Sequence, residues 1–142
     1  MIGKQDQKLL MLLRKNARVS ITDLAKALYL SRSTVQNRIA RLEASGVISG
    51  YSVQLGGAYT ASQVQAHVLI KVAQKLTART NSALEGMSSV SQLFSVSGEY
   101  DLIAIVQAQS LEELSTVLDD IGNLGGVERT NSSVVLETRF RR

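Results

Sequence analysis

Side chains that can bind the base edges and phosphates of DNA are concentrated between positions 31 and 41. A helix that turns Val35, Ile39 and Leu42 inward presents polar side chains on its opposite side and shoulders. Asn and Gln can bind adenine with two hydrogen bonds, Arg can bind guanine in the same way, and Ser or Thr can bind several base edges. Arg32 and Arg38 lie nearer the inward stripe, so we expect them to reach phosphates. The expected DNA-binding residues are Ser31, Arg32, Ser33, Thr34, Gln36, Asn37, Arg38 and Arg41.

Two short amphipathic helices joined by a tight turn would position these residues. Apolar side chains recur at helical spacing from Ile21 to Leu28, and a second apolar stripe begins at Val35 after a break at Leu30 and Ser31. Ser31 is a good N-cap, because its hydroxyl can accept a hydrogen bond from an unpaired amide of the first turn. The pattern predicts a helix-turn-helix, whose second helix enters the major groove of DNA. The alternative is an ordinary solvated helix in a small helical domain.

The distribution of charge favours DNA over that alternative. Residues 1–50 contain nine Lys or Arg side chains and three acidic ones, a net charge of +6, whereas residues 51–142 carry −2. A basic unit that coincides with a helix-turn-helix is typical of proteins that displace counterions from DNA. Aromatic residues make up 4% of the chain, which leaves little ring surface for stacking on single strands. Double-stranded DNA is therefore the expected partner.

The chain is expected to form two small domains, because 142 residues suffice for two and a hinge-like segment interrupts them. A leucine-rich helix at residues 6–15 would complete a three-helix, winged DNA-binding domain over residues 1–50. After Gly46 a run of β-branched residues, VISGYSV, predicts a short strand. The small, polar sequence LGGAYTAS predicts a hinge, and we place the linker at residues 51–63. The second domain is expected over residues 64–142.

The second domain alternates strands and helices in the order βαββαβ. This order predicts an α+β, ferredoxin-like fold in which both helices cover one face of a four-stranded antiparallel sheet. Val68 and Ile70 alternate with His67 and Lys71, so one face of the first strand is strongly apolar and the other is mixed. The uncovered face of such a sheet usually packs against a second copy of the chain, which predicts a homodimer. Strands are expected at 65–73, 90–96, 100–107 and 132–140, and helices at 77–87 and 110–121.

One turn in this domain combines a glycine, an aromatic hydroxyl and carboxylates. Residues 97–101, SGEYD, join two apolar strands. Gly and Asp are common turn formers, so a plain hairpin turn explains these residues when they are taken alone. A binding function for the turn needs support from other parts of the chain.

Three stretches of the chain together resemble the Lrp/AsnC family of feast/famine regulators. LLMLLRKNARVSITDLAKALYLSRSTVQNRIARLEASGVISGY resembles the DNA-binding half of that family, and SGEYDLIAIV and GGVERTNSSVVLE resemble two signatures of its effector domain. The likeness covers nearly the whole chain in the same order. It implies a transcription factor whose C-terminal domains pair through their sheets, with dimers assembling into tetramers, octamers or rings.

The resemblance also implies a crevice between dimers that binds a small molecule, usually an amino acid. Gly98 would let the backbone approach the ligand, Tyr100 would line the pocket, and Asp101 would hold an ammonium group. Thr130 and Ser132 match hydroxyl-bearing positions near the same crevice, although Ser132 stands where threonine is usual. The effector-binding residues that we expect are Gly98, Glu99, Tyr100, Asp101, Thr130 and Ser132.

No catalytic residue, metal site or cofactor is expected. The chain has no cysteine and one histidine, His67, which falls in an expected strand. The paired acids at positions 112–113 and 119–120 share one helix, where neighbours in sequence point in different directions. No long apolar run predicts a leader or a membrane span, so we expect a cytoplasmic, nucleoid-associated protein.

Two other functions fit parts of the same pattern. One is a ligand-sensing oligomer that acts through a protein partner, and the basic N-terminal domain disfavours it. The other is an architectural protein that wraps DNA with little sequence preference. We expect instead a dimer that places residues 31–45 of each subunit in successive major grooves, about one helical turn apart. An amino acid would shift the assembly state and thereby the affinity for DNA.

Overall fold

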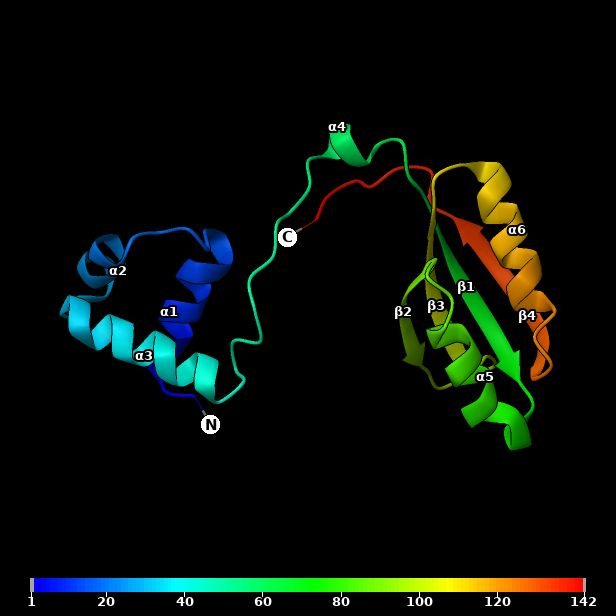
Figure 1. Ribbon diagram of the computed structural model, residues 1–142, viewed down its shortest axis with the longest axis horizontal. Helices are drawn as coiled ribbons and strands as arrows, with labels where there is room; N and C mark the ends of the chain where they lie inside the picture. The colour runs from blue at the N-terminus through cyan, green and yellow to red at the C-terminus, as the bar shows by residue number, and fades with distance from the viewer. Residues whose placement is uncertain (1, 142) are drawn as a thin grey trace. The chain divides into compact units, whose positions relative to one another are not determined.

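The computed structural model describes residues 2–141 and divides into two compact units between Gln54 and Leu55. The N-terminal unit contains three helices, α1 (Lys4–Lys15), α2 (Ile21–Leu28) and α3 (Arg32–Ala44), which are labelled in Figure 1. Within residues 2–141 every helix is too short or too polar to cross a lipid bilayer.

Serine hydroxyls start the second and third helices, as the sequence predicts. Ser20 accepts a hydrogen bond from the Asp23 N–H at 3.0 Å, and Ser31 accepts one from the Thr34 N–H at 3.2 Å. Tyr29 ends α2 in the left-handed conformation, with φ 55°. The tight turn between α2 and α3 is therefore formed, and the helix-turn-helix is present.

The core of the N-terminal unit is a cluster of aliphatic side chains contributed by all three helices. Leu9 from α1, Leu24 from α2 and Val35 from α3 are almost completely buried. Burying a side chain of this size contributes about 1.5–3 kcal/mol to the stability of the unit. The buried members of the cluster are Leu9, Leu13, Leu24, Ala25, Leu28, Val35 and Leu42.

The short strand predicted after Gly46 is not formed, and that prediction is wrong. The Ile48 N–H donates to the Leu42 carbonyl at 3.0 Å, and the Ile48 side chain packs on the N-terminal core. A strand requires a neighbouring strand for its backbone hydrogen bonds, and no strand is assigned within residues 45–63. The segment contains instead a four-residue helix, α4 (Gly57–Thr60).

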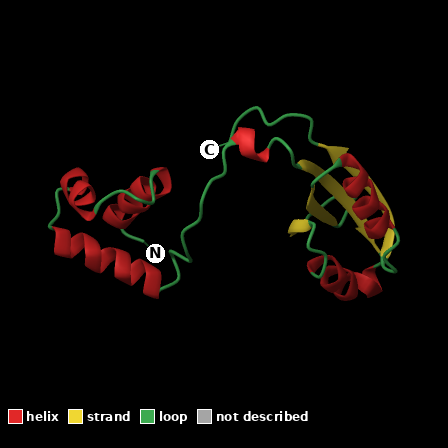
Figure 2. Ribbon diagram, turned by 45° about the horizontal axis from the view of Figure 1, so that its top comes forward, coloured by secondary structure: helices red, strands yellow, loops and turns green. Residues whose placement is uncertain are grey.

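The C-terminal unit is a four-stranded antiparallel sheet with two helices on one face (Figure 2). The strand order β2-β3-β1-β4 is that of the predicted βαββαβ arrangement. A single turn of 3₁₀ helix, η1 (Gln74–Leu76), leads into the first of the two helices. The elements are β1 (Val64–Val72), α5 (Thr77–Glu85), β2 (Val90–Ser95), β3 (Leu102–Ala108), α6 (Leu111–Gly122) and β4 (Val127–Val134).

The last strand begins five residues earlier than predicted and ends at Val134. Pairing with β1 determines this position, because Ala66 lies opposite Val134 and the Val135 N–H makes the next hydrogen bond, to the Gln65 carbonyl at 2.8 Å. Beyond that hydrogen bond only Val64 is left in β1, so the pairing of the two strands ends there. The apolar residues near position 135 misled the sequence analysis, since the register of the sheet, and not the local pattern, fixes the strand.

The two faces of the sheet differ as predicted. Ala66, Val68 and Ile70 of β1 are buried beneath the helices, whereas His67 is exposed on the other side. We call this other side the open face. Its apolar side chains include Phe94, which is 48% exposed. Across the strands the open face is formed by His67, Leu69, Lys71, Phe94, Ile103 and Ile105.

Gly126 stands at a position with no room for a side chain. A Cβ atom there would lie 2.0 Å from Thr80 Oγ1 and 3.1 Å from Leu76 Cβ. Thr80 is buried, and its hydroxyl donates to the Leu76 carbonyl at 2.9 Å. We expect Gly126→Ala to lower the free energy of unfolding of the C-terminal unit by about 1–3 kcal/mol, the usual cost of overpacking. Chemical denaturation measures this loss.

Gly125→Ala is the matched control for that substitution. A Cβ atom at Gly125 would meet nothing within 4 Å. The stability of this variant should stay within about 0.5 kcal/mol of the parent. Equal losses at the two positions would contradict the packing that the structure gives to Gly126.

Candidate nucleic-acid interface and effector site

Helix α3 has a buried apolar side and an exposed polar side. Val35 and Leu42 face the core, while Ser33, Gln36 and Asn37 are exposed. The first turn carries a hydroxyl cluster in which Ser31 Oγ lies 2.7 Å from Thr34 Oγ1 and 3.2 Å from Ser33 Oγ. A row of amides and hydroxyls on one exposed helix face has the chemistry needed to bind base edges.

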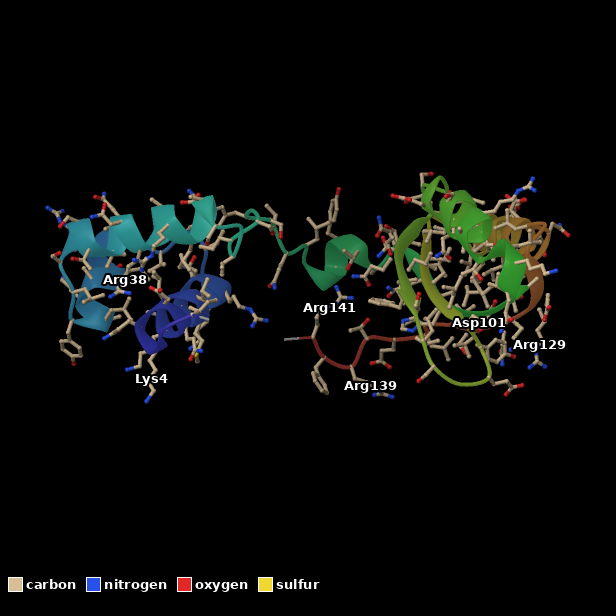
Figure 3. The ribbon with its side chains drawn as sticks, turned by 90° about the horizontal axis from the view of Figure 1, so that it is seen from below. Lys4, Arg38, Asp101, Arg129, Arg139 and Arg141 are labelled. Atoms are coloured by element: carbon tan, nitrogen blue, oxygen red, sulfur yellow. The ribbon has the colours of Figure 1, made fainter. Side chains whose placement is uncertain are left out.

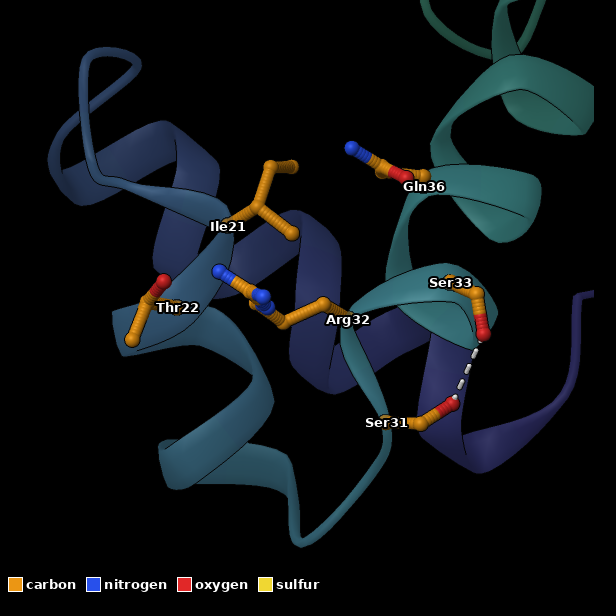
Figure 4. Close-up of a pocket in the computed structure, with 6 residues that line it drawn as sticks. All are labelled: Ile21, Thr22, Ser31, Arg32, Ser33 and Gln36. Atoms are coloured by element: carbon orange, nitrogen blue, oxygen red, sulfur yellow. Dashed lines mark hydrogen bonds between the residues drawn. The ribbon is translucent and has the colours of Figure 1, made fainter.

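An open hollow lies between the first turn of α2 and the start of α3. Figure 4 shows the Arg32 side chain extending toward Ile21, with Gln36 on the next turn of α3. The hollow therefore brings four of the predicted DNA-binding residues to one surface of the helix-turn-helix. Its lining residues are Ile21, Thr22, Ser31, Arg32, Ser33 and Gln36.

Arg38 and Arg41 are paired with an acid of the first helix. The Asp6 carboxylate accepts a hydrogen bond from Arg38 at 2.8 Å and one from Arg41 at 3.3 Å. The Arg38 side chain, labelled in Figure 3, is only 27% exposed. The sequence predicts that Arg38 reaches phosphates, whereas in the structure its guanidinium is hydrogen-bonded to Asp6 of α1.

The turn between β2 and β3 has the backbone geometry of a tight, glycine-dependent loop. Gly98 has φ 119°, a backbone conformation that residues other than glycine rarely adopt. Asp101 holds the end of the loop against β1: its N–H donates to the Ile70 carbonyl at 2.9 Å, and its Oδ2 accepts from the Val72 N–H at 2.8 Å. The carboxylate that the sequence analysis assigned to a ligand thus already has a backbone partner.

Arg129 of β4 completes this loop and was missed by the sequence analysis. Its guanidinium donates to the Glu99 carboxylate and lies over the Tyr100 ring, 5.1 Å from the centroid. The hydrogen bond to Glu99, above all, raises the pKa of the Arg129 side chain, which therefore stays charged. In Figure 3, Asp101 and Arg129 are labelled at the same end of the C-terminal unit. A cation, a ring and the Glu99 carboxylate meet there, and Asp101 follows next in the same turn.

Thr130 and Ser132 face away from this cluster within one subunit. In the register of the sheet Thr130 lies opposite Ile70 and Ser132 opposite Val68, so both are on the helix-covered side of β4. Arg129 lies opposite Lys71 and is on the open face. The structure thus brings four of the six predicted effector residues together, and the other two lie on the opposite side of the strand.

One of the paired acids of α6 caps its own helix, and the histidine lies on the sheet. Ser110 Oγ caps the start of α6 by accepting from the Glu113 N–H, and Glu113 Oε2 accepts a hydrogen bond at 2.8 Å from the N–H of Gln109, the residue before the cap. His67 lies in β1, exposed on the open face. Within residues 2–141 no group of three or more His, Cys, Asp or Glu side chains is arranged to hold a metal ion.

Comparison with known proteins gives matches over both units. The model of the Lrp/AsnC ligand binding domain matches residues 65–142, and a winged helix-turn-helix DNA-binding model matches residues 3–49. The HTH-type transcriptional regulator LysM of Sulfurisphaera tokodaii is 30% identical to this chain over 98% of both proteins.

Solved structures match along nearly the whole chain. The structure of AsnC from E. coli has a TM-score of 0.91 at 24% identity and covers 100% of this chain and 97% of its own, which is a likeness of fold. A feast or famine regulatory protein from M. tuberculosis, solved with L-methionine, has a TM-score of 0.87 at 29% identity and covers 99% and 96%.

Fold and matched regions define a transcriptional regulator that joins a helix-turn-helix DNA-binding unit to an α+β ligand-binding domain. The chain belongs to the Lrp/AsnC family. The resemblance and the fold class inferred from the sequence are thereby confirmed.

Proposed function

We propose that the chain binds specific sites in double-stranded DNA through α3 and that an amino acid bound to its C-terminal domain alters this binding. The observation that carries the proposal is the exposed row of Ser33, Gln36 and Asn37 on a helix whose other side is buried. The row lies in a unit with a net charge of +6 over residues 1–50. The charge supplies affinity for phosphates, and the amides supply discrimination between bases.

The proposed working unit is a homodimer, with tetramers or octamers built from it at the chromosome. Support comes from the open face, because its apolar residues Leu69, Phe94 and Ile103 form a patch that the two helices of the unit do not cover. Two copies that cover each other's open faces place two α3 helices on one piece of DNA. A roughly palindromic site with half-sites about one helical turn apart, or a multiple of it, would fit such a dimer.

The proposed effector site is the cluster around the β2–β3 turn. An amino acid needs an anion for its ammonium group and a cation or amides for its carboxylate. We assign the ammonium group to Asp101 Oδ1 and the carboxylate to Arg129, which would exchange its contact with Glu99 for the ligand. The relative from M. tuberculosis was solved with L-methionine, so L-methionine is the first ligand to test. Thr130 and Ser132 remain proposed contacts from a neighbouring dimer.

A substitution on the open face tests the dimer. Phe94→Glu is expected to convert the protein to monomers at concentrations at which the parent is a dimer, because a charge would be buried in an apolar interface. Light scattering after gel filtration measures the mass. Leu111→Glu is the control, since Leu111 is 65% exposed at the start of α6 on the helix-covered side. A dimer that survives Phe94→Glu but not Leu111→Glu would place the interface elsewhere.

Binding of the full chain to genomic fragments, with and without L-methionine and then the other amino acids, tests the proposed function. The expected result is tight, salt-sensitive binding to a small set of fragments, altered by one amino acid. Binding to all fragments alike would favour an architectural protein. Absence of DNA binding would contradict the proposal and favour action through a protein partner.

A further inference from the structure

The Asp6 carboxylate joins the first and third helices of the DNA-binding unit. Its Oδ1 accepts a hydrogen bond from Arg38 Nη1 at 2.8 Å, and its Oδ2 accepts one from Arg41 Nη2 at 3.3 Å. Residues 38 and 41 are three apart, so their side chains share one face of α3 and a single carboxylate reaches both. Two of the three cations of α3 are therefore engaged with α1, unless DNA displaces them.

The two arginines differ in how firmly they are held. Side-chain exposure is 27% for Arg38 and 65% for Arg41, while that of Asp6 is 11%. The Arg38 Nε atom is buried and has no hydrogen-bond partner, so the guanidinium is packed inside the domain. Withdrawing Arg38 would leave a desolvated carboxylate without its nearest cation, which is costly. Arg41 makes a longer, solvent-exposed contact that it can exchange at little cost.

We infer that Asp6 is a positioning residue that separates the roles of the two arginines. It keeps Arg38 as a brace between α1 and α3, and it releases Arg41 to a DNA phosphate when the helix enters the groove. The inference rests on the proposed function, because it concerns how the same helix meets DNA. It replaces the sequence-based expectation that Arg38 reaches phosphates.

The separation of roles predicts different salt dependences for two matched variants. Each phosphate contact contributes about −0.9 to the slope of log K against log salt concentration. Arg41→Gln is expected to reduce the size of that slope by about 1, with the melting temperature nearly unchanged. Arg38→Gln is expected to leave the slope unchanged and to lower the melting temperature by about 5 °C or more.

Asp6→Asn tests the carboxylate itself, because the amide keeps an oxygen acceptor and loses the charge. The slope of this variant is expected to become steeper by about 1, since Arg38 is then free to contact phosphate. Its melting temperature should fall. Asp23→Asn is the control: Asp23 is an exposed acid in the first turn of α2 that makes no ion pair among residues 2–141. This control should change neither quantity.

The experiment measures binding of the full chain and its four variants to one duplex by fluorescence anisotropy over a salt series, together with melting temperatures. A flatter salt slope for Arg41→Gln, together with an unchanged slope for Arg38→Gln, supports the inference. Equal flattening by both, or flattening by Asp6→Asn, overturns it. If Asp6→Asn does not fold, the two arginine variants decide. A parent protein that binds no duplex would refute the proposed function as well, whereas a parent that binds with the wrong order of slopes refutes this inference alone.

Discussion

Asn37→Ala is expected to weaken the preference for the correct DNA site over single-base-pair variants of it by about 1–3 kcal/mol, or roughly 5- to 150-fold. Asn37 lies exposed near the middle of α3, while Val35 and Leu42 hold the helix on the core. An amide in this place can make two hydrogen bonds to one adenine, and alanine can make none. Competition between duplexes in an anisotropy assay measures the preference.

Arg41→Gln is the control for base recognition by Asn37. A phosphate contact carries no sequence information, so this variant should weaken binding to all duplexes by a similar factor. The preference for the correct site should persist. If Asn37→Ala also weakened all duplexes alike, the exposed face of α3 would not be the surface that reads the bases.

Asp101→Ala is expected to abolish the influence of the effector on DNA binding while DNA binding without effector persists. The same substitution removes the acceptor of the Val72 N–H, which lies 2.8 Å from Asp101 Oδ2. Leaving a partly buried amide unpaired costs about 1–3 kcal/mol, so the C-terminal unit should also lose stability. DNA titrations with and without the amino acid, and chemical denaturation, measure the two effects separately.

Asp101→Asn separates the charge from the hydrogen bond. Its side-chain oxygen can still accept from the Val72 N–H, but it cannot neutralise an ammonium group. The asparagine variant should therefore recover most of the stability and none of the effector response. A full effector response in Asp101→Asn would show that the effector does not need the charge of Asp101. Asp101 would then be a structural residue of the turn.

Local signals in the sequence were sufficient for the five longer helices and for most of the strands, although they missed the four-residue helix α4. The hydroxyl of Ser31 and the apolar spacing of Val35 and Leu42 place α3 within one residue of its observed start, because capping and amphipathic periodicity act over one or two turns. The alternation of Val68 with His67 identified the two faces of the sheet, because the two-residue period of a strand is also a local signal.

Pairings between distant parts of the chain could not be predicted from the sequence. The partner of Arg38 is 32 residues away in sequence and that of Arg129 is 30 residues away. No spacing rule connects such residues until the fold brings them together. The run after Gly46 and the end of β4 were assigned wrongly for a related reason, since a strand exists only where another strand pairs with it.

Selection of duplexes from a random-sequence library by the full chain tests the central claim most directly, namely that α3 reads DNA sequence. The account predicts enrichment of one roughly palindromic motif with half-sites about one helical turn apart or a multiple of it, and loss of preference at matching positions in Asn37→Ala. Salt-sensitive binding with no enriched motif would contradict the account and assign the protein to architectural binding.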